Sequence, residues 1–134
     1  MWKAGDTFKG TLIKKGNEHL HIILSDPYLS ETGETVVLTF MSTYNGNSNT
    51  EEDSCIIEQG EHPFAKHRSY LVFSDCREVS VSALDKELQK GTIERREPLS
   101  KELLRRAIDG MQSSRNVKRD LKDRTKQLQL DLMD

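Results

Sequence analysis

The residues with the clearest capacity for chemistry lie in the segment 53–77, DSCIIEQGEHPFAKHRSYLVFSDCR. Two histidines, His62 and His67, lie on either side of Pro63 and Lys66, between two short apolar runs. Such runs, rich in β-branched and aromatic residues and separated by Gly and Pro, predict two strands and a connecting loop. The loop would present imidazole and amine groups from a sheet, and loops on rigid scaffolds commonly carry binding and catalytic residues.

A second histidine pair, His19 and His21, begins another predicted strand. Side chains two residues apart on a strand share a face, so both imidazoles should project to the same side. They are either solvated histidines at a strand edge or part of a polar cluster with His62 and His67. The spacings H-x-H and H-x4-H could supply zinc ligands, but no acidic or thiol position accompanies them. We therefore predict neither a metal nor another cofactor.

Cleaving RNA without a metal requires a group that removes the 2′-hydroxyl proton, a group that protonates the leaving oxygen, and a nearby cation. Histidine suits the first two roles because its unperturbed pKa lies near neutrality. Lys66 or Arg68 could supply the cation. The segments 19–21 and 62–69 together contain all the residue types that this chemistry needs.

The elements that must position these residues are short strands followed by helices. The pattern predicts strands at 7–14, 19–25, 35–43, 55–58 and 70–74, with a short extra strand at 78–81, hence a small all-β sandwich or barrel. A single helical turn is expected at 82–85. Ser100 is the expected N-cap of a stronger helix with one apolar face, made by Leu103, Leu104, Ala107, Ile108 and Met111. Beyond Ser114 apolar residues are sparse, so we expect a frayed or partner-ordered tail that packs little.

Composition limits the class of protein. The chain has 134 residues, of which 34% are hydrophobic and 31% are charged, which is enough for one core and an appendage. Residues 1–95 hold ten Lys and Arg against fifteen Asp and Glu (−5), whereas residues 96–134 hold ten against seven (+3). Because phosphate affinity needs a concentrated cationic face, any nucleic-acid contact should be local or carried by the tail.

Targeting and cysteine signals are few. No run approaches the roughly 18 apolar residues that span a bilayer. The N-terminal residues MWKAGDTFKG lack an apolar signal region, so we predict a cytoplasmic protein. Cys55 and Cys76 could pair, but in such a protein buried free thiols are favoured.

The order of these elements resembles the PemK/MazF family, toxins of bacterial toxin–antitoxin pairs. Members typically have a Gly-Asp before the first strand, matched by Gly5-Asp6, which is also read simply as a turn. A strand of the type Arg-Pro-x-(apolar)3-Ser is matched by His19–Ser25, and an apolar strand ending in Thr-Ser by Val36–Thr43. The resemblance covers roughly residues 4–90.

The resemblance implies a dimeric, SH3-like β-barrel, which we place at residues 1–95. The segment 96–134 has no clear counterpart in the short toxins, and its own pattern predicts a C-terminal helix and a charged, partly mobile tail. It also implies an antitoxin partner, an RNA substrate and metal-independent endoribonuclease activity. The family's usual catalytic arginine falls at His19 and its catalytic threonine at Ser42. Either the chemistry has moved onto histidines or nuclease activity has been lost. We predict His19, Ser42, His62 and His67 as catalytic residues, and His21, Lys66, Arg68 and Ser69 as RNA-binding residues.

An alternative function keeps the fold without the chemistry. The chain would then be a non-catalytic SH3-like binding module whose basic helical tail engages a protein or nucleic-acid partner. Trp2 has two interpretations, either covering one end of the barrel or stacking a base, as aromatic residues do in single-strand sites.

Overall fold

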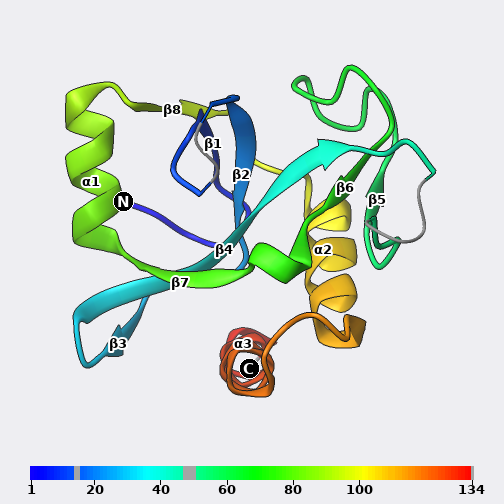
Figure 1. Ribbon diagram of the computed structural model, residues 1–134. Coiled ribbons are helices and arrows are strands. Elements are labelled where there is room, and N and C mark those ends of the chain that lie inside the picture. Colours follow the sequence, from blue (N-terminus) through cyan, green and yellow to red (C-terminus); the bar gives the residue numbers. More distant parts are fainter. Residues whose placement is uncertain (14–15, 47–50, 134) are drawn as a thin grey trace.

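The longest strand, β4 (Gly33–Thr43), runs through the middle of a mainly antiparallel β-sheet (Figure 1). The computed structural model describes residues 1–13, 16–46 and 51–133, with side chains to residue 126. The other strands are β1 (Thr7–Gly10), β2 (His19–Ile23), β3 (Tyr28–Ser30), β5 (Ile56–Ile57), β6 (Ser69–Leu71), β7 (Arg77–Ser80) and β8 (Ile93–Arg96). A mainly β body is therefore confirmed.

The sheet is open. Its strands follow the order β5-β6-β4-β2-β1-β8, while β3 and β7 also pair with β4. Among the described strands, β5 and β8 lie at opposite edges and do not pair with each other. The chain therefore forms an eight-stranded sheet. The pairing of the described strands does not close this sheet into the SH3-like barrel expected from the sequence.

Alternating side chains divide the core between the two faces of the sheet. On β2, Leu20 and Ile22 contribute to one cluster of buried residues, whereas Ile23 contributes to the other. The first cluster packs against the C-terminal helices, and the second packs against the N-terminal residues and the helix after β7. Trp2 belongs to the second cluster, is 1% exposed and donates through Nε1 to Asp85 (2.8 Å). This burial supports the covering interpretation of Trp2.

The helix after β7 is longer than the single turn expected at 82–85. Helix α1 (Val81–Lys90) begins after Ser80, whose hydroxyl accepts a hydrogen bond from the Ala83 amide (3.1 Å). It ends at Gly91, which has a left-handed conformation with φ of 80°. Leu84 is its buried anchor against the sheet. The cap at Ser80 and the glycine at the end explain the additional turns.

The predicted helix after Ser100 is confirmed. Helix α2 (Lys101–Ser113) has Ser100 as N-cap and buries Leu103, Ala107 and Met111. Gly110 lies in its last turn and is buried. A Cβ at this position would lie 2.6 Å from the Ser54 carbonyl oxygen, so the glycine allows α2 to approach the chain before β5 closely.

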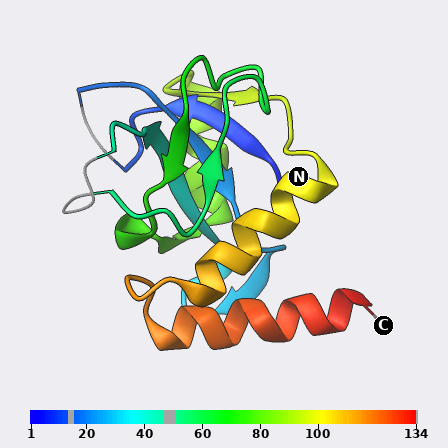
Figure 2. The same ribbon diagram turned by 90° about the vertical axis from the view of Figure 1, so that its right-hand side faces the viewer.

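The expectation that the chain packs little beyond Ser114 is wrong. Helix α3 (Arg119–Met133) lies beside α2 at one end of the sheet (Figure 2). Val117 and Leu121 are each 6% exposed, and both belong to the same core cluster as α2. The buried Thr125 accepts a hydrogen bond from Gln112 Nε2 (2.9 Å). Two buried apolar side chains and one hydrogen bond thus hold a segment that has few apolar residues.

Strands β3 and β8 were missing from the sequence prediction. β8 pairs with β1 along its length, from Thr7 opposite Arg96 to Gly10 opposite Ile93, and so crosses the expected boundary at residues 95 and 96. A Cβ on Gly10 would lie 2.8 Å from Ile93 Cγ2, so this strand pair also depends on glycine. Arg96 is therefore the last residue of a strand in the sheet, and Glu97 follows it directly. Both residues line the cleft described below.

Both cysteines are free, with Cys55 buried and Cys76 half-buried. Burial raises the pKa of the Cys55 thiol to about 11 and that of Cys76 to about 12. No helix within the described ranges is both long and apolar enough to cross a bilayer.

Candidate functional site

A cleft of about 660 Å³ lies between the loop that joins β5 to β6 and the ends of β2, β4 and β8. This volume falls within the range of sites for small ligands, roughly 300–1,000 Å³. Its lining combines imidazole, hydroxyl, amine, guanidinium, carboxylate and apolar groups: Glu18, His19, Met41, Ser42, Thr43, His62, Pro63, Phe64, Lys66, His67, Ser69, Arg96 and Glu97. All four predicted catalytic residues line it, together with two of the four predicted RNA-binding residues.

The strand register explains why distant residues meet here. β2 pairs with β4 with His21 opposite Phe40, and continuing this register by two residues places His19 opposite Ser42. On the other side of β4, Ser42 lies opposite Tyr70 of β6. Burial raises the pKa of Tyr70, while a hydrogen bond from Ser42 acts in the opposite direction. Ser42 and Tyr70 are therefore cross-strand neighbours on one face of the sheet.

His19 is held in one orientation by the backbone. Its Nδ1 lies 3.2 Å from the Met41 carbonyl oxygen, which can only accept, so Nδ1 carries the proton. The ring also contacts Phe40, with a centroid distance of 4.7 Å. Nε2 is buried and has no hydrogen-bond partner among the described residues. Buried polar atoms are rarely left without a partner, so each exception requires an explanation.

His62 has a different environment, with both ring nitrogens engaged. Its Nε2 donates to the Glu97 carbonyl oxygen (2.5 Å), and its Nδ1 accepts from the Phe64 amide (3.0 Å). The side chain is 3% exposed. Neither nitrogen is free for proton transfer, so we assign His62 a structural role. Its bond to Glu97 joins the β5–β6 loop to the chain after β8, across the opening between the two sheet edges.

The rest of the β5–β6 loop presents groups to solvent. Lys66 and His67 are exposed, and no ion pair between described residues involves Lys66. The Ser69 hydroxyl donates to the His67 carbonyl oxygen (2.9 Å), which shapes the chain between the loop and β6. The loop thus supplies one amine and one imidazole to the open side of the cleft.

Two predicted RNA-binding residues lie outside the cleft. His21 is completely buried, stacks on Phe8 (4.6 Å) and donates through Nδ1 to the His19 carbonyl oxygen (3.1 Å). Burial lowers the pKa of His21 to about 4, so it is a neutral core residue. Its assignment as an RNA ligand is wrong because no surface ligand can reach it. Arg68 instead pairs with Glu58 (3.1 Å) and lies over the Tyr44 ring.

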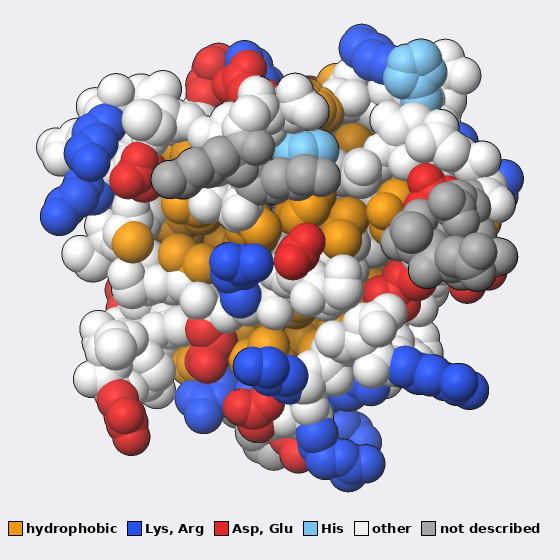
Figure 3. All heavy atoms as spheres, viewed as in Figure 1, with side chains coloured by type: hydrophobic (Ala, Val, Ile, Leu, Met, Phe, Trp, Pro, Cys, Tyr) orange, Lys and Arg blue, Asp and Glu red, His pale blue; other side chains and the backbone are white. Residues whose placement is uncertain are grey.

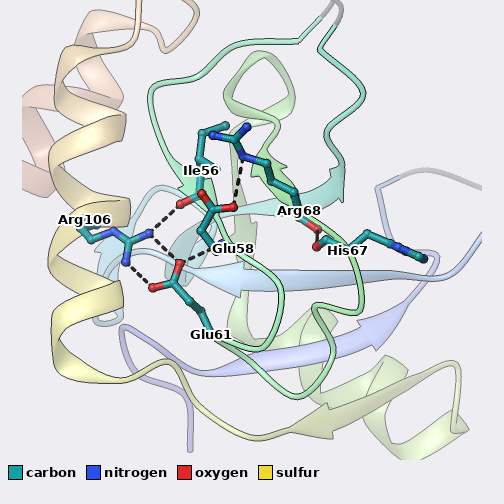
Figure 4. A network of polar contacts seen from close by, with 7 residues as sticks. Ile56, Glu58, Glu61, His67, Arg68 and Arg106 are labelled. Atoms are coloured by element: carbon teal, nitrogen blue, oxygen red, sulfur yellow. Dashed lines mark hydrogen bonds and ion pairs between the residues drawn. The ribbon is translucent and has the colours of Figure 1, made fainter.

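The loop is braced from its far side by helix α2. Arg106 donates to both carboxylate oxygens of Glu61 (2.5 and 2.9 Å) and to the Ile56 carbonyl oxygen (2.6 Å). The hydrogen bonds from Arg106 lower the pKa of Glu61 to about 2. Figure 4 shows this network, with the His67 side chain pointing away from it. The bracing therefore leaves His67 free to face the cleft.

Sequence reasoning missed the residues that come from β8 and from the floor. Arg96, at the end of β8, lines the cleft and pairs with Glu94 (2.5 Å). Met41, Pro63 and Phe64 add apolar surface, while Glu18 and Glu97 add carboxylates. The signal for Arg96 was the alternation of Thr92-Ile93-Glu94, which is too short to identify a strand without its partner β1.

In the described part of the chain, no group of three or more His, Cys, Asp or Glu side chains could hold a metal ion.

Comparison with known proteins adds no assignment. No family model, curated protein or solved structure matches this chain. The cleft itself therefore carries the functional argument.

Proposed function

We propose that the protein is a metal-independent endoribonuclease that binds single-stranded RNA in this cleft. The observation that carries the proposal is the state of His19. Its Nδ1–H is fixed on the Met41 carbonyl, which leaves the lone pair on Nε2, the atom without a described partner. A 2′-hydroxyl is a donor that would satisfy this acceptor, and a general base needs this tautomer.

In the proposed reaction, His19 acts as the general base and His67 as the general acid, because His21 and His62 use both ring nitrogens in hydrogen bonds within the protein. The 2′-oxygen attacks the adjacent phosphorus and its proton passes to His19 Nε2. The bond between phosphorus and the 5′-oxygen breaks, and the leaving oxygen takes a proton from the His67 imidazolium. The products are a 2′,3′-cyclic phosphate and a 5′-hydroxyl.

The charged residues would position the phosphate between the two walls of the cleft. Lys66 approaches from the β5–β6 loop and Arg96 from β8, so a phosphodiester between them would meet a cation on each side. The apolar surface of Phe64 and Met41 suits a base. Glu18 and Glu97 oppose further negative charge, which favours a site for one phosphate over a long cationic groove.

The resemblance to PemK/MazF toxins gives this proposal its biological setting. It includes an SH3-like barrel, a homodimer, a cytoplasmic location and an antitoxin protein as partner. The hydrogen bond from His62 to Glu97 is consistent with such a barrel because it bridges the sheet edges that strand pairing leaves open.

One observation favours a binding module without catalysis as the second candidate. His19 Nε2 is closed off from solvent, so a substrate reaches it only after side chains in the cleft wall move. If they stay in place, the cleft would still hold RNA through Lys66 and Arg96, and no proton transfer would occur.

Cleavage of a labelled single-stranded RNA in the presence of EDTA tests the proposal. We expect the wild type to cut, His19→Gln to lose at least a hundredfold in rate, and Lys66→Ala to lose activity while Lys86→Ala does not. Lys86 is a matched control because it is an exposed lysine on α1, outside the cleft. A hundredfold loss is the lower end of what general acid–base catalysis contributes.

The outcomes separate the two candidates. RNA that stays intact but binds the wild type more tightly than Lys66→Ala would support the binding module. RNA that neither binds nor is cut would refute both. Cleavage that His19→Gln leaves unchanged would refute the assignment of the base.

A further inference from the structure

A stripe of cations runs along helix α3, at the end of the molecule away from the cleft. The basic stripe consists of Lys118, Arg119, Lys122 and Lys126. At 3.6 residues per turn these four positions fall within an arc of about 100°, and they span about 12 Å along the helix. Figure 3 shows Lys and Arg side chains gathered over this lower end, with some acidic side chains between them.

The four cations have no ionic partners within the described residues. Every ion pair found there involves cations elsewhere in the chain. Lys118 and Arg119 also lie at the N-terminal end of α3, where a positive charge opposes the helix dipole and costs stability. The stripe therefore does not serve the stability of its own helix.

The helix that carries the stripe is firmly placed. Leu121 is buried in the core, and Gln112 of α2 donates to the Lys122 carbonyl oxygen (3.0 Å). Before α3, the Glu52 carboxylate accepts from the Ser114 hydroxyl (2.8 Å) and from Asn116 Nδ2 (3.1 Å). A partner would thus meet cations on a helix that is already in place, so binding would cost little backbone entropy.

The chemistry of this face selects the kind of partner. From residue 118 to residue 126, the exposed and half-buried side chains are all charged. Protein interfaces depend on aromatic or aliphatic anchors, and interfacial membrane helices need an apolar face. Between residues 118 and 126, the one apolar side chain, Leu121, is buried in the core. A row of cations without an apolar anchor complements a repeating anion, as found in nucleic-acid backbones.

We propose that the basic stripe binds the phosphodiester backbone of a nucleic acid, independently of the cleft and of the activity proposed for it. Binding should be insensitive to base sequence because the stripe offers cations to phosphates only. Four phosphate contacts on duplex DNA predict a slope of about −3.6 for the logarithm of the binding constant against the logarithm of salt concentration.

Fluorescence anisotropy with the full chain and a 20-base-pair DNA duplex tests the proposal, since DNA lacks the 2′-hydroxyl needed for cleavage. We expect Lys118→Gln/Lys126→Gln to flatten the salt slope by about two and to weaken binding uniformly across sequences. Lys3→Gln/Lys86→Gln removes the same charge from exposed lysines elsewhere and should leave the slope unchanged. Parallel titrations with duplex and single-stranded RNA identify which nucleic acid binds best.

Three results would overturn the proposal: no binding by the wild type at low salt, equal losses in the two double variants, or equally tight binding of a polyglutamate peptide. The last result would identify an acidic protein segment as the partner. Retained duplex binding by Lys66→Ala, with or without RNA cleavage by the wild type, would show that the stripe and the cleft act separately.

Discussion

The buried His21 makes a quantitative prediction about acid stability. Burial lowers its pKa from 6.5 to about 4 in the folded protein. A folded pKa below the unfolded value means that the contribution of His21 to stability is fully present above pH 6.5 and is lost as the pH falls toward 4. A pKa difference of one corresponds to about 1.4 kcal/mol, so the loss should reach roughly 3 kcal/mol.

Urea unfolding of the wild type and His21→Gln at pH 7, 6, 5 and 4 measures this contribution. The variant should be less stable at pH 7, because it loses the stack on Phe8 and the contacts of both ring nitrogens. Its free energy of unfolding should then fall less steeply below pH 6.5. His67→Gln, at an exposed position, should follow the wild type. Identical pH dependence in wild type and His21→Gln would refute the burial of a neutral imidazole.

Three further predictions concern the supports of the cleft and the helices. Gly110→Ala should lower the free energy of unfolding by about 1–2 kcal/mol, because the clash of the new methyl group with the Ser54 carbonyl outweighs the gain of up to about 1 kcal/mol in helix propensity. A more stable variant would contradict the close approach of α2 to Ser54. Leu121→Ala should lower the free energy of unfolding by about 2–4 kcal/mol, because Leu121 is buried. The control Leu29→Ala, at an exposed position, should lower it by less than about 0.5 kcal/mol in the same thermal or urea unfolding experiment. Equal losses in the two variants would mean that α3 does not pack against the core. The lowered pKa of Glu61 stabilises the folded protein above pH 4.5, and this stabilisation is lost as the pH falls toward 2. Glu61→Gln should therefore make the free energy of unfolding less dependent on pH in this range. An unchanged acid unfolding transition would argue against the pair with Arg106.

Local patterns in the sequence were sufficient for most of the sheet and for α2. The apolar run of β4 and the N-cap at Ser100 each follow from neighbouring residues alone. β8 was missed because its four residues, Ile93–Arg96, become a strand only through pairing with β1. The docking of α3 was missed for a similar reason, since two buried residues, Val117 and Leu121, give a weak pattern but a complete contact.

The candidate site shows the same limit at the level of single side chains. Residue type and spacing brought His19, His62 and His67 into one group, the resemblance to PemK/MazF toxins added Ser42, and all four line one cleft. Type alone could not separate their environments. Only tertiary contacts show that His62 uses both nitrogens, while His19 has one nitrogen without a described partner.

The chemical nature of the RNA ends is the measurement that tests the central claim most directly. We predict that wild-type protein with EDTA converts a single-stranded RNA to products that carry a 2′,3′-cyclic phosphate and a 5′-hydroxyl, as identified by mass spectrometry, and that His19→Gln does not. The same oligonucleotide with 2′-deoxy sugars should stay intact. Products with a 3′-hydroxyl and a 5′-phosphate, cleavage of the deoxy oligonucleotide, or an inert wild-type protein would contradict the assignment of His19 as the base that takes the 2′-hydroxyl proton.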